Sequence, residues 1–282
     1  MKSHPALADL HRFALALEYN GLTFSGWQRQ RSSELTTVQA ELELALSSVA
    51  DRPVTAVCAG RTDAGVHASC QIVHFDCEID RGDKAWTLGI NSLLPANIRV
   101  LWSKPVGQEF HARFSATARR YVYVIYSAKI GSALLVGQLC HLHHDLDVCR
   151  MQKAAEFLVG EQDFSAFRAA GCQSRSPFRN VFEASVYQSG AYCIFDIRAN
   201  AFLQHMVRNI SGALISIGKG DRDPEWIEEL INTKDRTRAG VTAPPNGLYL
   251  MQVDYPPHFE LPLTSRLPLL LGSSDVASER TD

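Results

Sequence analysis

The chain has 282 residues, 46% of them hydrophobic, and a formal net charge of −2 at pH 7. This length predicts a sizeable buried core divided between two domains. Charged residues interrupt every apolar run long enough for a signal peptide or a membrane span, so we expect a cytoplasmic protein without membrane association. Seven cysteines, an odd number without a C-x-x-C pair, argue against a disulfide framework or a structural zinc site.

The charges are unevenly distributed along the chain. Residues 104–126 hold four basic residues against one acidic residue, and residues 164–210 hold five against two. Residues 221–236, in contrast, hold six acidic residues against three basic ones. Arginine, which suits planar recognition of phosphate, dominates both basic windows. A basic cleft for a nucleic acid and a set of solvated strand edges both fit this distribution.

The first half of the chain reads as a β-α-β-β-α-β unit. The expected elements are a strand at 13–19, a helix at 38–49, strands at 54–58 and 70–77, a helix at 84–94 and a strand at 98–106. Val38, Leu42 and Leu46 lie on one stripe of the first helix, the spacing of a helix packed on a sheet.

The second half repeats that order. The expected elements are a strand at 119–126, a helix at 145–159, strands at 181–188 and 192–198, helices at 202–217 and 224–232, and a strand at 248–253. The sequence therefore predicts an α+β fold of two ferredoxin-like, RRM-like domains, residues 1–108 and 109–260, whose sheets flank a central cleft. Residues 261–282 are expected to form a poorly ordered tail.

A loop at residues 59–68 has the composition of a segment that holds one carboxylate in a fixed place. Gly60 and Gly65 allow unusual backbone conformations or close approach to a ligand, and Arg61 and Asp63 stand between them. β-Branched and apolar segments on both sides predict strands that anchor the loop. A plain connection, in which Asp63 caps a turn or pairs with Arg61, is the alternative reading.

Aromatic residues beside arginines form a second group of candidates. Tyr121 follows two arginines and can stack a base, although an ordinary packed strand tyrosine has the same pattern. The histidines at 141, 143 and 144 cannot all reach one ion from one strand, so we expect a strand end there and no metal site.

Five motifs, taken in order, closely resemble the tRNA pseudouridine synthase A family. They are Gly-Trp-Gln-Arg-Gln at 26–30, Gly-Arg-Thr-Asp-Ala-Gly-Val-His at 60–67, the segment 111–121, Asp-Phe-Ser-Ala-Phe at 163–167 and the segment 200–209. The resemblance covers about residues 11–260, and the loop motif is highly specific in this company.

The resemblance implies an RNA-binding catalytic cleft that isomerises uridine to pseudouridine at positions 38, 39 and 40 of the tRNA anticodon stem-loop, without a cofactor and in a homodimer. Carried over by motif, Asp63 is the catalytic carboxylate. Tyr121, Arg61 and Arg208 are implied to bind the target nucleotide, and Arg168, Phe202 and His205 to contact RNA.

These residue types fit the chemistry. Breaking the bond between C1′ and N1 develops oxocarbenium character on the ribose, which a nearby carboxylate can stabilise or capture. Whether Asp63 attacks C1′ or removes a ribose proton stays open, and Arg208 or Arg61 is the expected partner that keeps the carboxylate ionised. A catalytically idle RNA-binding protein and an RNA N-glycosidase that releases free uracil are the two alternatives.

Overall fold

The computed structural model describes residues 10–30, 35–262, 268 and 271. The strands form one sheet in the order β4-β1-β3-β10-β5-β9-β8-β7, with β2 paired to β3 and β6 paired to β5 outside this path. No helix in the described ranges is long and apolar enough to cross a bilayer.

The N-terminal half has the predicted order of elements. It comprises β1 (His11–Tyr19), α1 (Val38–Ala50), β2 (Ala56–Cys58), β3 (His67–Cys77), α2 (Ile90–Leu93) and β4 (Ile98–Val106). The side chain of Thr37 caps α1, and Asp51 ends it in the left-handed conformation. The helix expected at 84–94 is a π-helical turn at Ala85–Gly89 followed by the short α2.

The C-terminal half repeats the plan with two added strands. It comprises β5 (Ala118–Ser127), β6 (Cys140–Leu142), α3 (Val148–Glu156), β7 (Gly160–Asp163), β8 (Phe178–Ser189), β9 (Tyr192–Ala199), α4 (Met206–Gly218), α5 (Trp226–Thr233) and β10 (Leu248–Asp254). The helix expected from residue 145 begins at Val148, because the side chain of Asp147 accepts a hydrogen bond from the backbone N–H of Arg150 and caps it.

The sheets of the two halves are joined edge to edge, which the sequence did not predict. β2 covers only one end of β3, where Cys58 pairs with Val73. The chain then leaves the sheet as the loop 59–66, and the exposed edge at the other end of β3 pairs in parallel with Tyr249 and Leu250 of β10. The pairing satisfies backbone groups that two open edges would leave unpaired.

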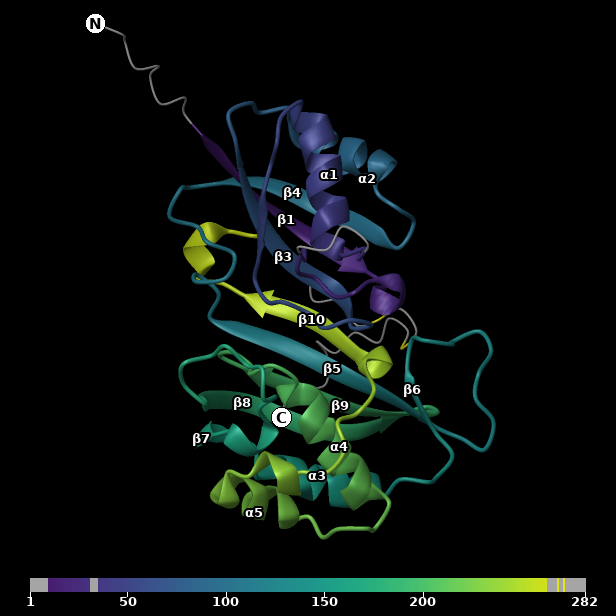
Figure 1. Cartoon of the computed structure of the whole chain (residues 1–282). Coiled ribbons are helices and arrows are strands. Elements are labelled where there is room, and N and C mark those ends of the chain that lie inside the picture. Colours follow the sequence, from purple (N-terminus) through teal and green to yellow (C-terminus); the bar gives the residue numbers. More distant parts are fainter. Residues whose placement is uncertain (1–9, 31–34, 263–267, 269–270, 272–282) are drawn as a thin grey trace, which may run out of the picture.

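The helices of both halves cover the same face of this sheet, in two groups (Figure 1). α1 and α2 lie over the N-terminal strands and α3, α4 and α5 over the C-terminal strands, while β10 and β5 cross between the groups. One buried core runs beneath both groups and includes Trp27, Trp86, Phe75, Phe164 and Phe167. The α+β class and both β-α-β-β-α-β halves are thus confirmed.

The predicted domain boundary between residues 108 and 109 falls in the connection between β4 and β5 and stays a prediction. The tail expected at 261–282 lies outside the described residues except at positions 261, 262, 268 and 271.

Candidate active site

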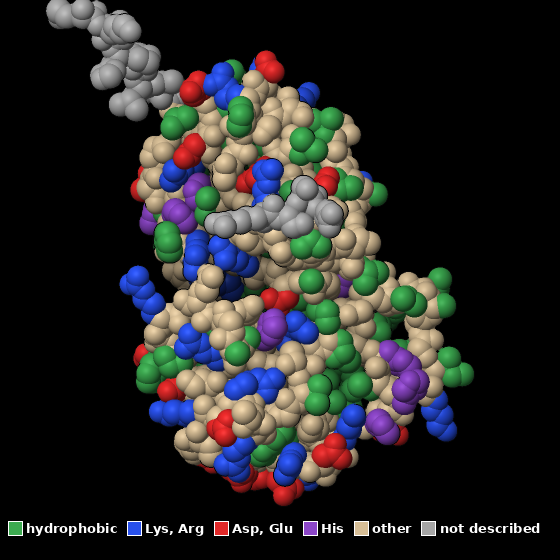
Figure 2. Space-filling model, viewed as in Figure 1, with side chains coloured by type: hydrophobic (Ala, Val, Ile, Leu, Met, Phe, Trp, Pro, Cys, Tyr) green, Lys and Arg blue, Asp and Glu red, His purple; other side chains and the backbone are tan. Residues whose placement is uncertain are grey.

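A cavity of about 1030 Å³ lies between the two halves, over the junction of the sheets. Basic side chains gather around the waist between the halves in the space-filling view (Figure 2). Among the described residues that line the cavity, Asp63 is the single carboxylate. The arginines that line it are Arg61, Arg113, Arg119, Arg179 and Arg208. The cavity therefore combines one acidic group with strongly cationic walls.

Neighbouring segments hold the Asp63 loop on both of its sides. The backbone N–H of Trp27 donates to the carbonyl of Thr62 at 3.0 Å, and the hydroxyls of Thr62 and Tyr19 lie 2.8 Å apart. Gly65 has a φ of 77°, and a Cβ there would lie 2.9 Å from the ring of Pro245. The residue after Asp63 and Ala64 must therefore be glycine, both for its conformation and for its space.

Two buried polar side chains fix the beginning of the loop. Gln71 Nε2 donates to the carbonyl of Gly60 at 2.6 Å, and Arg119 Nη2 donates to the carbonyl of Ala59 at 2.9 Å. Both residues are less than a tenth exposed. Sequence reasoning missed Gln71 and left Arg119 in a basic window, as either a phosphate-binding or a solvated cation, because neither carbonyl partner is near in the chain. Arg119 is instead a buried structural residue whose guanidinium donates hydrogen bonds to backbone carbonyls.

Asp63 meets two groups from the beginning of α4. Its Oδ2 atom lies 3.3 Å from Nη1 of Arg208 and 3.4 Å from Nε2 of His205. Nε of Arg208 donates to the carbonyl of Ala243 at 2.9 Å, which orients the guanidinium. The Asp63 side chain is 29% exposed, so it is shielded but reachable. Of the two arginines expected beside it, Arg208 makes the contact, whereas Arg61 lines the cavity and is exposed.

Tyr121 and Phe202 form the aromatic wall of the cavity. Their rings meet edge to face, with centroids 5.1 Å apart and planes at 83°. Tyr121 comes from β5 and Phe202 from the segment before α4, so the wall joins two elements of the C-terminal half. Burial raises the pKa of the Tyr121 hydroxyl well above its ordinary value. The hydroxyl therefore stays neutral, and Tyr121 lines the cavity as a largely buried ring, 8% exposed, supported by Phe202.

Other basic residues of the two windows are engaged elsewhere. Arg168 does not line the cavity; its Nη2 donates to the carbonyls of Cys172 and Ser174 at 2.8 and 2.7 Å and so shapes the cavity wall at 171–174. Arg120 forms an ion pair with Asp196. Only some of the predicted arginines therefore converge on the cleft.

The cluster of histidines at 141–144 lies outside the cavity. His141 is in β6, and its Nε2 lies 2.8 Å from the carbonyl of Ala128. Over the described ranges, no group of three His, Cys, Asp or Glu residues is arranged to hold a metal ion.

The sequence is similar to known proteins over most of its length, in both halves of the fold. The model of the tRNA pseudouridine synthase family matches residues 15–115 and 154–256, one segment in each half. The chain is 54% identical over 260 residues to tRNA pseudouridine synthase A of Vibrio vulnificus strain YJ016, covering 92% of this chain and 98% of the relative. It is 53% identical over 263 residues to the protein of that name from Klebsiella pneumoniae strain 342, covering 93% of this chain and 97% of the relative.

The chain thus belongs to the tRNA pseudouridine synthase family, a class of isomerases that act on tRNA. Among solved structures, the archaeal box H/ACA sRNP Nop10-Cbf5 complex aligns with a TM-score of 0.32 at 12% identity, covering 83% of this chain and 59% of that one. A likeness at this level carries no weight for the fold or the site.

Proposed function

We propose that this chain isomerises uridine to pseudouridine at positions 38, 39 and 40 of the tRNA anticodon stem-loop, with Asp63 as the catalytic carboxylate. The observation that carries the proposal is a cavity in which Asp63 is the single carboxylate among the described lining residues, beside five arginines and the Tyr121–Phe202 pair. A carboxylate suits a reaction that develops positive charge on a ribose, and Arg61 and Arg113, which are exposed and line the cavity, suit the phosphates on either side of it.

The contacts of Asp63 support this role. Nη1 of Arg208 lies 3.3 Å from Oδ2 of the carboxylate and holds that oxygen on the side of α4. The loop is held by Trp27, Gln71 and Arg119, so the carboxylate keeps its place when a nucleotide enters. A fixed, charged group costs no reorganisation at the moment of reaction.

The reaction conserves every atom of uridine. The bond from C1′ to N1 breaks, the uracil anion stays in the site and turns, and C5 then bonds to C1′. The proton on C5 leaves and N1 takes up a proton, so the balance requires neither a redox partner nor a cofactor. Attack of Asp63 on C1′ and removal of a ribose proton by Asp63 both fit this sequence of bond changes.

The surrounding residues have separate roles in the proposal. Tyr121 and Phe202 hold the free base between bond cleavage and bond formation. Arg61, exposed at the cavity wall, contacts RNA beside the flipped nucleotide. Arg168 acts on RNA through the wall segment that it orders. Taking a base out of a stem costs a few kcal/mol, which contacts to the backbone offset.

The decisive experiment incubates the protein with an unmodified tRNA transcript. Digestion and chromatography then quantify pseudouridine, free uracil and unchanged uridine. Pseudouridine at positions 38, 39 and 40 is the expected product. Free uracil would identify an N-glycosidase, and binding without product would identify a catalytically idle RNA-binding protein. A transcript with cytidine at the three positions is the matched control.

We place the active form in the cytoplasm and propose that it is a homodimer. The dimer is proposed because a tRNA is longer than one subunit of this length is wide. A compact chain of this size has a radius of gyration of about 19 Å. Two subunits related by a two-fold axis offer one cavity and a second surface to the same tRNA.

A further inference from the structure

His205 has a backbone conformation that histidine seldom adopts. Its φ and ψ are 62° and 3°. The turn that contains it is closed by the N–H of Met206, which donates to the carbonyl of Leu203 at 3.1 Å. These dihedral angles match the third residue of a type II turn, where glycine is preferred because it has no Cβ to crowd the backbone, and asparagine because its short polar side chain hydrogen-bonds locally. A histidine here costs stability.

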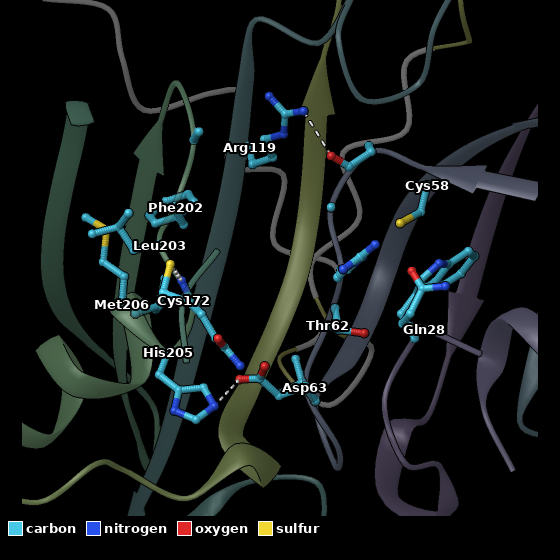
Figure 3. A pocket seen from close by; sticks show the side chains of 18 of the residues that line it. Gln28, Cys58, Thr62, Asp63, Arg119, Cys172, Phe202, Leu203, His205 and Met206 are labelled. Carbon is cyan, nitrogen blue, oxygen red and sulfur yellow. Dashed lines mark hydrogen bonds and ion pairs between the residues drawn. The ribbon is translucent and has the colours of Figure 1, made fainter. Parts of the chain in front are cut away.

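Helix capping does not explain the histidine either. His205 occupies the N-cap position of α4, but its side chain makes no capping hydrogen bond. Serine, threonine, aspartate and asparagine are the residues that this position favours. The imidazole turns instead toward Asp63, with Nε2 3.4 Å from Oδ2 (Figure 3). Strained backbone conformations persist at functional sites, where the contact that they permit is part of the mechanism.

His205 and Arg208 act on the same carboxylate oxygen. They are three residues apart at the beginning of α4, His205 at its N-cap and Arg208 in its first turn. Both contact Oδ2 of Asp63. Among the hydrogen bonds of the described residues, the one to this carboxylate is accepted by Oδ2 and none by Oδ1. One oxygen of the carboxylate is thus held from two directions, and the other is left for a ligand in the cavity.

We propose that His205 is a positioning residue for the reaction: together with Arg208 it fixes Oδ2 of Asp63, so that Oδ1 is the oxygen presented to the ribose. This inference rests on the proposed function of Asp63. It assigns His205 to the carboxylate and not to RNA, the role that the sequence resemblance implied.

The test replaces His205 by residues that fit the left-handed backbone but cannot reach Asp63. His205→Gly and His205→Asn both satisfy this condition. We expect kcat for pseudouridine formation to fall at least about tenfold and KM for tRNA to stay within about twofold. The melting temperature of the variants is expected to stay equal or to rise, because the strain is relieved.

Asp51→Gly is the matched control. Asp51 has a φ of 55° at the end of α1, is exposed and lies outside the cavity. This variant relieves the same kind of strain, so its melting temperature should not fall and its kcat should equal that of the parent protein.

Three results would overturn the inference. Unchanged kcat would remove His205 from the reaction, and raised KM with unchanged kcat would make it an RNA contact. A fall in melting temperature together with kcat in both variants would make it a packing residue. The parent protein is measured in the same assay; if it forms no pseudouridine, the proposed function fails, whereas parent turnover matched by the variants refutes only the role of His205.

Discussion

Arg119 binds the carbonyl of Ala59, the residue at which the chain leaves the sheet to form the Asp63 loop, at 2.9 Å. Its guanidinium also donates to the carbonyls of Arg113, Ala116 and Asn200. Burial lowers the pKa of Arg119 from its ordinary value, and four carbonyl acceptors compensate for the lost hydration of the cation. One side chain of β5 therefore connects the Asp63 loop to the segments on either side of the cavity.

Arg119→Lys is expected to destabilise the protein by about 1–3 kcal/mol, because an ammonium group cannot reproduce the planar fork of donors and leaves buried carbonyls unpaired. Denaturant unfolding measures the effect. Arg175→Lys, at an exposed position, is the control and should change stability by less than about 0.5 kcal/mol. Equal unfolding midpoints for the two variants would contradict the stabilising role of the Arg119 hydrogen bonds.

Asp63→Asn is expected to abolish pseudouridine formation and to leave the affinity for tRNA within a few-fold of the parent. The substitution keeps the shape of the side chain and removes its charge. Turnover and binding are measured on the same preparation, with the exposed Asp83→Asn as the control. Residual turnover above about a tenth of the parent value, a loss of only about 1.4 kcal/mol in the barrier, would exclude Asp63 from the central role.

Tyr121→Phe is expected to retain more affinity for tRNA than Tyr121→Ala. Stacking of a base on an aromatic ring contributes about 1–3 kcal/mol and requires only the ring, and phenylalanine also keeps the edge-to-face contact with Phe202. Binding is the appropriate measurement, because loss of the hydroxyl can affect turnover separately. Equal dissociation constants for the two variants would argue against stacking.

Binding of tRNA is expected to weaken steeply with salt, although the net charge of the chain is −2. Each phosphate neutralised on a duplex contributes a slope of about −0.9 in a plot of log affinity against log salt concentration. Arg61→Gln, which removes an exposed arginine from the cavity wall, should reduce the slope by about one such unit. Arg222→Gln, outside the cavity, should leave it unchanged. A flat salt dependence of the parent protein would refute a basic RNA-binding cleft.

Local sequence signals predicted the main helices and strands, though not β6 and β7, and they predicted the Asp63 loop, because these features depend on spacing within short segments. Flanking strands and glycines made Asp63 recognisable, and the turn at Gly65 is the conformation that such a glycine allows. The contacts that complete the site were not predictable in this way. Arg208 contacts Asp63 across 145 residues of chain, so that within the sequence only the resemblance to a known family associates the two residues.

The remaining differences have the same physical origin. The pairing of β3 with β10 joins strands from the two halves of the sequence, and no periodicity within either strand indicates its neighbour. The left-handed backbone of His205 could not be predicted, because glycine and asparagine are the residues that indicate this conformation in a sequence. Arg119 is buried where composition predicted a solvated or phosphate-bound cation, since only tertiary packing supplies its four carbonyl partners.

The dimer proposal predicts that turnover depends on protein concentration. If one subunit supplies the cavity and its partner supplies surface for the same tRNA, dilution below the dissociation constant of the dimer should lower the turnover per subunit. Adding excess Asp63→Asn subunits to the diluted parent should then raise that turnover, because each mixed dimer retains one intact cavity and gains a complete partner. A monomeric enzyme behaves in the opposite way, since the inactive protein only competes for tRNA. Sedimentation at the assay concentration gives the independent check, and a fully active monomer would rule out the requirement for a dimer.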